Sequence, residues 1–354
     1  MPQMPDRPSS KPIAIWLLIG VAMIMIQVLL GGITRLTESG LSITEWKPIT
    51  GMLPPLNLVE WQAEFDKYKH TDQFKYIHAD FTLHNFKFIF FWEWFHRVWA
   101  RLLGIVFLTG FFIFLVKRKF KKDMVIPMII LFLLGAMQGL VGWIMVRSGL
   151  VGEKMFVGHI ELATHFIAAL ILLCYTLWFA LRLWVPGEKC LVHPRLKKLA
   201  LLILSILFIQ LVYGAFMSGL KASTAAPTWP DINGQMIPGG ISQLSPWWKN
   251  LTDNKITVQL IHRSIAYLLI LLVSAWWIMA RKNKTNLLFN KTKWIPLILI
   301  LLQVLLGVFT VIRSPFGNEL VWFALAHQFT AMLFLIIMMW MLFLIRSRIQ
   351  SNRP

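Results

Sequence analysis

The sequence predicts an all-α integral membrane protein whose eight membrane-spanning helices form two four-helix bundles related as a parallel repeat. Of its 354 residues, 57% are apolar and only 14% are charged, whereas average soluble domains carry about a quarter charged residues. The mean hydropathy is +0.64. Apolar runs long enough to cross about 30 Å of hydrocarbon recur along the chain. We expect membrane-spanning helices at 12–33, 88–116, 124–146, 156–184, 199–220, 256–280, 294–312 and 319–345.

The first apolar run is expected to be retained as a helix. It is about 20 residues long, and it lacks the small-residue cleavage site that ends a secretory signal. The run therefore counts as the first of the eight spans.

The loops on the outer side alternate long, short, long and short, at 34–87, 147–155, 221–255 and 313–318. A duplicated four-helix unit has this pattern, and four intervening helices leave both halves in the same orientation. We expect one bundle within residues 1–190 and the other within 191–354. Each odd-numbered run also contains Gln-x-x-x-Gly, at Gln27/Gly31, Gln138/Gly142, Gln210/Gly214 and Gln303/Gly307.

The net charge of +19 is expected to orient the chain in a membrane rather than to bind nucleic acid. Cytoplasmic loops of membrane proteins are enriched in Lys and Arg. The sequence predicts a multi-pass protein of the bacterial inner membrane with both termini in the cytoplasm. The basic segments that fall on this one side are the N-terminus, 117–122, 182–198, 281–293 and 346–353.

Four histidines lie one in each even-numbered run, at His96, His165, His262 and His327. Counted from the expected helix starts, they lie at a similar depth, about 9–14 Å from the outer ends. Imidazoles are costly in an apolar core, so four at repeated positions favour ligands over ordinary buried polar residues. Two that face each other across a four-helix bundle can ligate haem iron, whereas zinc or copper would more often bring a third ligand.

The two cysteines are not expected to take part. Cys174 lies in the fourth run and Cys190 in a cytoplasmic loop, so neither is placed for an external disulfide. Two cysteines alone cannot hold an iron–sulfur cluster.

Haem would also need partners for its propionate groups. Arginine suits carboxylates because its guanidinium donates in a planar fork. Interfacial snorkelling is the alternative explanation for any one of these basic residues. The candidates near the outer level are Arg35, Arg97, Arg147, Lys221, Arg263 and Arg313.

A carboxylate distinguishes the two halves. Glu93 precedes His96 by three residues and shares its helix face, whereas the corresponding residue in the second half is Gln259. A carboxyl group beside a haem edge could move protons or orient an oxygen species, and glutamine cannot titrate. We therefore expect chemistry in the first half, with Glu93 as the catalytic residue, and a stable cofactor in the second. The alternative is an interfacial carboxylate paired with Arg97.

The remaining outer histidines are expected to be peripheral. His159 lies close to the outer surface of the fourth run and is interpreted as interfacial. His70, His78 and His84 are interpreted as solvated loop residues.

The candidate site residues resemble those of the haem A synthase family, and the resemblance covers nearly the whole chain. It rests on EWFHR at 93–97, LATH at 162–165, IHR at 261–263 and AHQ at 326–328. The first loop adds GITRLTESGLS at 32–42, followed by WKP at 46–48.

The resemblance implies an oxidoreductase that converts the C8 methyl group of haem O to a formyl group by successive hydroxylations, giving haem A for a terminal cytochrome oxidase. It also implies that His96 and His165 are axial to haem O or haem A, and His262 and His327 to a haem b cofactor. Some relatives carry a cysteine pair in an outer loop. This chain has none there and resembles the proteobacterial and mitochondrial branch.

Two other functions stay open at this point. A membrane cytochrome b would carry electrons between quinol and a partner through two permanent haems b. A transporter of haem or a small molecule would use the repeat for alternating access. The expected surroundings are lipid, with a haem O synthase, an electron donor and a second copy of the chain as candidate partners.

Overall fold

The structure is a computed structural model that describes residues 10–45, 50–151, 154–185, 190–283 and 286–346. The WKP sequence at 46–48 and the basic residues of both terminal segments, 1–9 and 347–354, lie outside the described residues. The described chain is mostly helical, as predicted.

Among the described residues, eight helices are long and apolar enough to cross a membrane, which confirms the predicted number. Three of them begin three or more residues away from the predicted positions, at Leu83 rather than 88, at His159 rather than 156 and at Pro194 rather than 199. Capping explains the first shift, because Thr82 and Asn85 form a capping box that starts the helix before its apolar run. The eight are α1 (Lys11–Leu36), α4 (Leu83–Val116), α5 (Lys122–Gly149), α6 (His159–Trp184), α7 (Pro194–Gly219), α9 (Lys255–Ala280), α11 (Ile295–Ile312) and α12 (Gly317–Leu344).

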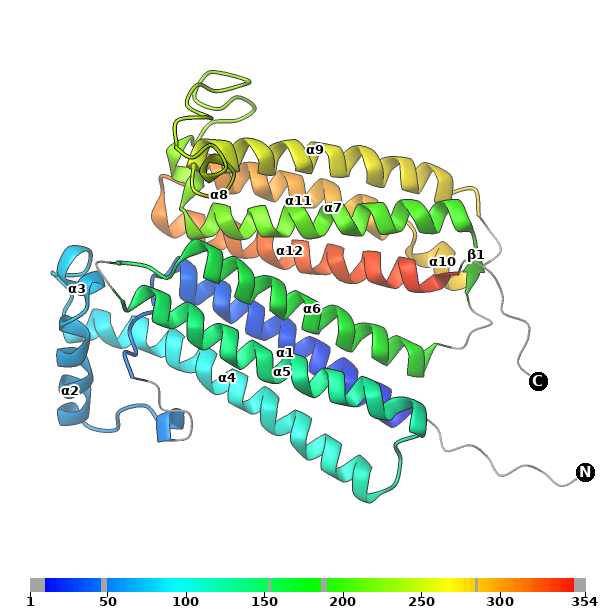
Figure 1. Cartoon of the computed structure of the whole chain (residues 1–354), viewed down its shortest axis with the longest axis horizontal. Coiled ribbons are helices and arrows are strands. Elements are labelled where there is room, and N and C mark those ends of the chain that lie inside the picture. The colour runs from blue at the N-terminus through cyan, green and yellow to red at the C-terminus, as the bar shows by residue number, and fades with distance from the viewer. Residues whose placement is uncertain (1–9, 46–49, 152–153, 186–189, 284–285, 347–354) are drawn as a thin grey trace, which may run out of the picture.

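The spanning helices lie in two groups, which Figure 1 shows side by side. In the N-terminal group, α1 packs on α4 and α6, and α5 packs on α6. In the C-terminal group, α7 and α11 each pack on both α9 and α12. The groups meet where α6 contacts α7 and where α1 contacts α12. At the second contact, Gln328 Nε2 donates to the carbonyl oxygen of Val28 at 2.8 Å.

One apolar cluster extends across both groups. Leu170 and Leu173 of α6, Ile203 of α7 and Met338 of α12 are all fully buried in one apolar cluster. The lipid side differs, because α4 exposes large apolar side chains such as Phe112. In a bilayer such side chains need no protein cover, since lipid tails are as apolar as leucine.

The long connections gather at one end of the molecule, here called the loop end. The first residues of α1 and the last residues of α12 lie at the opposite end of the molecule (Figure 1). That opposite end holds α10 (Leu287–Thr292) and a two-residue parallel strand pair, β1 (Leu191–Val192) with β2 (Ile345–Arg346). The loop end holds η1 (Thr50–Met52), α2 (Leu58–Lys69), α3 (Asp72–Tyr76), η3 (Ala222–Ala225) and α8 (Lys249–Thr252).

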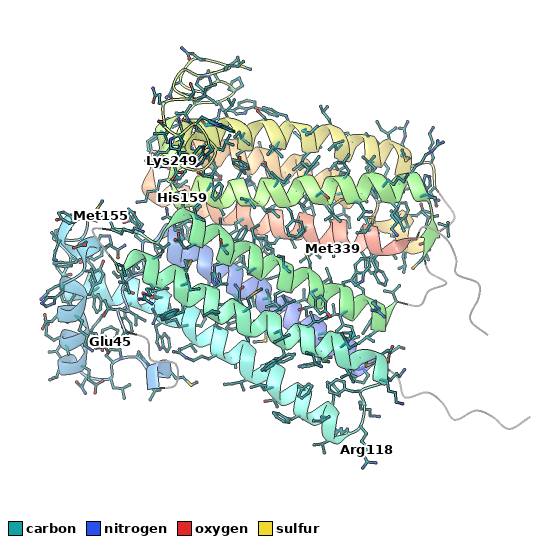
Figure 2. The ribbon with its side chains drawn as sticks, in the orientation of Figure 1. Glu45, Arg118, Met155, His159, Lys249 and Met339 are labelled. Carbon is teal, nitrogen blue, oxygen red and sulfur yellow. The ribbon has the colours of Figure 1, made fainter. Side chains whose placement is uncertain are left out.

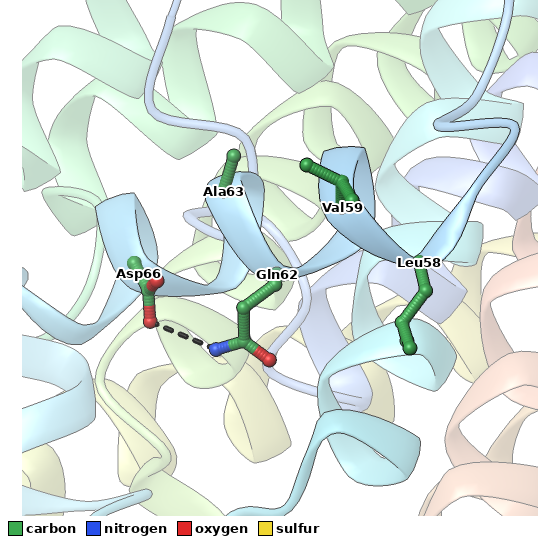
Figure 3. Close-up of a pocket in the computed structure, with 5 residues that line it drawn as sticks. All are labelled: Leu58, Val59, Gln62, Ala63 and Asp66. Atoms are coloured by element: carbon green, nitrogen blue, oxygen red, sulfur yellow. Dashed lines mark hydrogen bonds between the residues drawn. The ribbon is translucent and has the colours of Figure 1, made fainter.

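Helix α2 lies across the first turns of α4 and is held there by aromatic packing. Phe65 stacks on Phe86 with ring centroids 5.0 Å apart, and Tyr68 stacks on the same ring at 5.3 Å. A shallow hollow on the surface of α2 is unrelated to the predicted site residues (Figure 3). It is lined by Leu58, Val59, Gln62, Ala63 and Asp66.

The prediction that His78 is solvated is wrong. Its side chain is buried, its ring stacks on Phe81 at 3.9 Å, and its Nδ1 lies 2.7 Å from the hydroxyl oxygen of Tyr68. The first loop folds over this ring, so the imidazole forms part of a small core. His70 and His84 are exposed, as predicted.

Candidate functional site

Each of the four predicted ligand histidines contacts a glutamine on a neighbouring helix. Every spanning helix thus contributes either a histidine or its glutamine partner, and the glutamines are those of the repeated Gln-x-x-x-Gly sequence. The distances from glutamine Nε2 to the nearest ring nitrogen are 2.9 Å for Gln27–His96, 3.2 Å for Gln138–His165, 3.4 Å for Gln210–His262 and 3.2 Å for Gln303–His327.

The glycine of each sequence makes room for the same ring. A methyl group added at these glycines would approach the histidine Cε1 to 3.4 Å or less, so any larger residue would press on the imidazole. The distances are 3.2 Å for Gly31–His96, 2.8 Å for Gly142–His165, 3.4 Å for Gly214–His262 and 2.9 Å for Gly307–His327.

The expected equal depth of the histidines, counted from the helix starts, is wrong. His96 lies thirteen residues after Leu83, the first residue of α4, whereas His165 lies six residues after His159, the first residue of α6. The reason is that α4 extends further at the loop end, where it supports α2. The glutamine contacts, rather than the helix ends, are what the four histidines share.

The two histidines of the C-terminal group face each other. The ring centroids of His262 and His327 lie 6.4 Å apart with an angle of 68° between the planes. Two imidazoles that bind one metal ion through nitrogens about 2 Å from it have centroids about 6 Å apart. Their spacing therefore fits axial ligation of one haem iron.

Several buried polar atoms at these rings and their glutamines have no hydrogen-bond partner. His96 Nδ1 and His262 Nδ1 have no hydrogen-bond partner, and neither does the Oε1 atom of any of the four glutamines. Buried polar atoms are normally bonded, so a group of orphans marks a place where a ligand completes the bonding. The residues present thus fit a haem with imidazole ligands.

The N-terminal group is more open than the C-terminal group. Helix α9 packs on α11, whereas α4 and α5, both fully described, do not pack on each other to that extent. A methyl group added at Gly104 of α4, or at Gly135 or Gly139 of α5, would meet no atom within 4 Å. Within the described residues, His96 and His165 also make no ring contact like that of His262 and His327.

Glu93 is buried, and both of its carboxyl oxygens are bonded. Oε2 accepts from Ser42 Oγ at 2.7 Å and from the backbone nitrogen of Ile43 at 2.8 Å. Oε1 accepts from Arg97 at 2.6 Å, so the ion pair named as the alternative to catalysis is present. Arg97 also donates to the carbonyl oxygens of Ile43 and Glu45. Glu93 and Arg97 together hold residues 42–45 over the loop end of the bundle.

Gln259 and Arg263 hold the corresponding loop of the C-terminal group. Gln259 Nε2 donates to the carbonyl oxygen of Ala226 at 2.9 Å, and Arg263 donates to those of Thr228 and Asp231, both at 2.8 Å. The residues three before and one after the histidine therefore hold the long loop in both groups. They differ in charge at one position, where Glu93 is replaced by Gln259.

Two other propionate candidates lie at the contact between the groups. Arg35 donates to the carbonyl oxygens of Ser218 and Gly219, and Lys221 pairs with Glu38. The remaining two interact within their own group. Arg147 lies over the Trp143 ring at 5.3 Å, and Arg313 pairs with Glu319 at 3.2 Å.

Glu38 joins the two groups through several donors. His78 Nε2 lies 3.3 Å from its Oε2, and Lys221 bonds to its Oε1. These contacts, with the hydrogen bond from His78 the largest cause, lower the pKa of Glu38 to about 2.

His159 also lies at the contact between the groups. Figure 2 labels it at the loop-end start of α6, on the side that faces the C-terminal group. Its Nε2 is 3.5 Å from Asp253 and its ring meets Phe216 edge-on at 5.7 Å.

Sequence reasoning found the histidines but assigned no role to the glutamines beside them. The repeated Gln-x-x-x-Gly spacing was the signal that could have revealed those contacts. It also missed Ser42 and the backbone of Ile43 as partners of Glu93, which no spacing in the sequence indicates.

Comparisons with known proteins identify the family of this chain. A family model described as "Cytochrome oxidase assembly protein", COX15-CtaA, matches residues 14–339. A protein named heme A synthase from Rhodopseudomonas palustris is 42% identical over 93% of this chain and 88% of its own length. Heme A synthases from Parvibaculum lavamentivorans and Flavobacterium psychrophilum are 40% and 38% identical, each over 92% of this chain, and over 92% and 96% of their own lengths. With matches over most of its length, the chain belongs to the COX15-CtaA family of cytochrome oxidase assembly proteins.

Proposed function

We propose that this chain is a haem A synthase. It is an oxidoreductase that converts the C8 methyl group of haem O to a formyl group by successive hydroxylations, and its product serves a terminal cytochrome oxidase. The observation that carries the proposal is the set of four partly buried Gln–His–Gly contacts in a chain whose relatives are named heme A synthase.

The two groups hold different haems in this proposal. His262 and His327 ligate a resident haem b, and the 6.4 Å spacing of their rings supports that role. His96 and His165 ligate haem O and then haem A, and the open side between α4 and α5 suits a ligand that must enter and leave. Haem iron supplies the electron-transfer and oxygen-activating chemistry of both pockets.

Glu93 is the catalytic residue of this proposal. It lies three residues before His96, and each of its three partners, Ser42, Ile43 and Arg97, is a hydrogen-bond donor. A carboxylate held in this way has a fixed position and acts as an acceptor, as a group that takes protons from a reacting carbon substituent must. Gln259 offers no such acceptor charge in the other group.

The six basic residues remain the candidates for the propionates. Arg263 supports this role best, because its Nε is buried without a partner and its neighbour is His262. Arg97 occupies the matching position beside His96. Arg35, Arg147, Lys221 and Arg313 complete the set.

The protein is a multi-pass membrane protein. We place it in the bacterial inner membrane with both termini in the cytoplasm, because the basic loops share one side. Its proposed partners are a haem O synthase that delivers the substrate, an electron donor and a second copy of the chain.

Pigment analysis tests this function. The chain is expressed in bacteria that make haem O but no haem A, and the haems extracted from the membranes are identified by mass spectrometry. We expect haem A together with haem b from the purified protein. Haem b and unchanged haem O alone would contradict the proposal, and two non-exchanging haems b would identify an electron carrier instead.

A further inference from the structure

We propose that Gln27, Gln138 and Gln210 of the Gln-x-x-x-Gly sequences are positioning residues for the axial histidines. Each of these side-chain amides bonds to one ring nitrogen and so leaves the other nitrogen of that ring for iron. This inference rests on the proposed function, because it requires that the histidines bind haem.

The contacts of the rings support this division. His96 and His262 meet their glutamines through Nε2, and their Nδ1 atoms are buried without a partner. His165 meets Gln138 through Nδ1. His327 is the exception and lies outside the proposal, because its Nε2 meets the Gln303 side chain while its Nδ1 lies 3.0 Å from the Gln303 carbonyl oxygen.

The amide group can serve the ring both before and after metal binding. A neutral imidazole bound to metal carries a hydrogen on its other nitrogen, and metal-bound histidines almost always donate that hydrogen to an acceptor. An amide carries two donors and one carbonyl acceptor on the same carbon. In all four glutamines the Oε1 atom is buried and has no partner, so a half-turn of the amide presents an unused acceptor to the ring.

The amide is also neutral, which matters for the electronic state of the iron. A carboxylate acceptor draws the ring hydrogen more strongly and makes the imidazole a more basic ligand. A glutamine holds the ring without that effect. Replacement by glutamate therefore keeps an acceptor of the same shape and lowers the midpoint potential of the haem.

The competing explanation is that the glutamines only support the helix packing. The C-terminal group distinguishes this explanation from positioning of the histidine ring better than the N-terminal group does. In the N-terminal group, Gln27 and Gln138 also donate to the backbone carbonyls of His96 and His165, at 3.2 and 3.1 Å. The described contact of the Gln210 side chain is with the His262 ring alone. Loss of the Gln210 amide therefore removes a contact to the ring without breaking a bond to the backbone.

The experiment uses the purified full chain with its resident haem b. Gln210→Leu is compared with wild type by the low-spin electron paramagnetic resonance spectrum and by the rate of haem transfer to apomyoglobin. We expect changed g-values and haem loss about 10-fold or more faster, the usual effect of removing an outer partner of a metal ligand. Gln210→Glu should keep the wild-type transfer rate and lower the midpoint potential.

The matched control is Gln328→Leu. Gln328 is an amide next to His327 on α12, but it bonds to the carbonyl oxygen of Val28 instead of a histidine. We expect its spectrum and transfer rate to equal those of wild type.

A Gln210→Leu variant that binds haem with wild-type g-values and a wild-type transfer rate would overturn the inference. If this variant does not fold, Gln210→Glu decides, and an unchanged midpoint potential would overturn the inference. Wild-type protein that holds no haem would instead overturn the proposed function, so the two failures are distinguishable.

Discussion

The N-terminal and C-terminal helix groups repeat the same Gln–His–Gly contacts but surround them differently. In the C-terminal group, α9 packs on α11 and the two histidine rings lie 6.4 Å apart. In the N-terminal group, α4 and α5 leave that side open, and a buried carboxylate stands where the other group has an amide. In the proposed function, this difference lets the closed group retain a cofactor while the open group turns over a substrate.

The long loops of the two groups are held at matching positions but by partly different side chains. Arg97 and Arg263 each bind backbone carbonyls of the long loop that precedes their helix. Their neighbours Glu93 and Gln259 bind the same loops through different chemistry, the first as an acceptor and the second as a donor. The chemical difference between the groups is thus confined to a small number of atoms.

Replacement of Glu93 is expected to have the largest effect on haem A formation. Glu93→Gln keeps an oxygen that can accept from Ser42 and Ile43, but it loses the charge and the ability to take a proton. We expect haem A formation to fall by about 100-fold or more, because general acid–base catalysis contributes that much. The absorbance of the resident haem b should not change.

Gln259→Glu is the matched change in the other group, and it should leave haem A formation within about twofold of wild type. Wild-type rates in the Glu93→Gln variant would remove Glu93 from the catalytic role. It would then remain a loop anchor.

Glycine-to-alanine substitutions test whether the two pockets are separate. The added methyl group would lie 2.8 Å from the His165 ring in Gly142→Ala and 2.9 Å from the His327 ring in Gly307→Ala, so each ring must move. Such overpacking costs about 1–3 kcal/mol. We expect Gly142→Ala to lower haem A formation with the resident haem intact, and Gly307→Ala to lower resident haem occupancy, both measured on one preparation.

Gly214→Ala is the control for these variants. Its methyl group would stand 3.4 Å from His262, a distance that a small adjustment relieves. Equal effects of Gly142→Ala and Gly307→Ala on both haems would show one shared pocket.

Loss of the Glu38 carboxylate at the contact between the groups should have the smallest effect. Its contribution to the stability of the fold should depend on pH. The pKa of Glu38 is lowered to about 2, chiefly by the hydrogen bond from His78. A carboxyl group with a lowered pKa stabilises the fold fully above its ordinary pKa of 4.5, and this stabilisation is lost as pH falls towards 2. We expect a contribution of at most about 1 kcal/mol after solvent screening.

Thermal unfolding in detergent between pH 6 and pH 3 measures this contribution. The wild type should lose stability over that range more steeply than Glu38→Gln, which has no carboxyl group to protonate. Parallel curves for the two proteins would contradict the assignment.

Hydropathy and charge were enough to predict eight spanning helices, because the bilayer imposes one strong constraint on each segment. The starts of α4, α6 and α7 were misplaced, since the caps at Thr82 and His193 and the support of α2 depend on contacts outside the apolar runs. The two-residue strand pair at 191–192 and 345–346 joins segments far apart in the chain. No local pattern could reveal it.

The candidate site was predictable to a similar degree. Regular spacing in the sequence indicated the four histidines and the four glutamines, and the structure places each histidine against one of these glutamines. Burial of His78 was missed because it depends on how the first loop folds around Phe81 and Tyr68. The bonds from Ser42 and Ile43 to Glu93 were missed for the same reason.

One measurement tests the division of labour between the groups most directly. His96→Ala and His262→Ala are purified as full chains from cells that make haem O, and the haems bound to each are extracted and identified by mass spectrometry. The account predicts that His96→Ala keeps haem b but yields no haem A, whereas His262→Ala loses haem b. Loss of haem b from His96→Ala, or its retention in His262→Ala, would contradict the account.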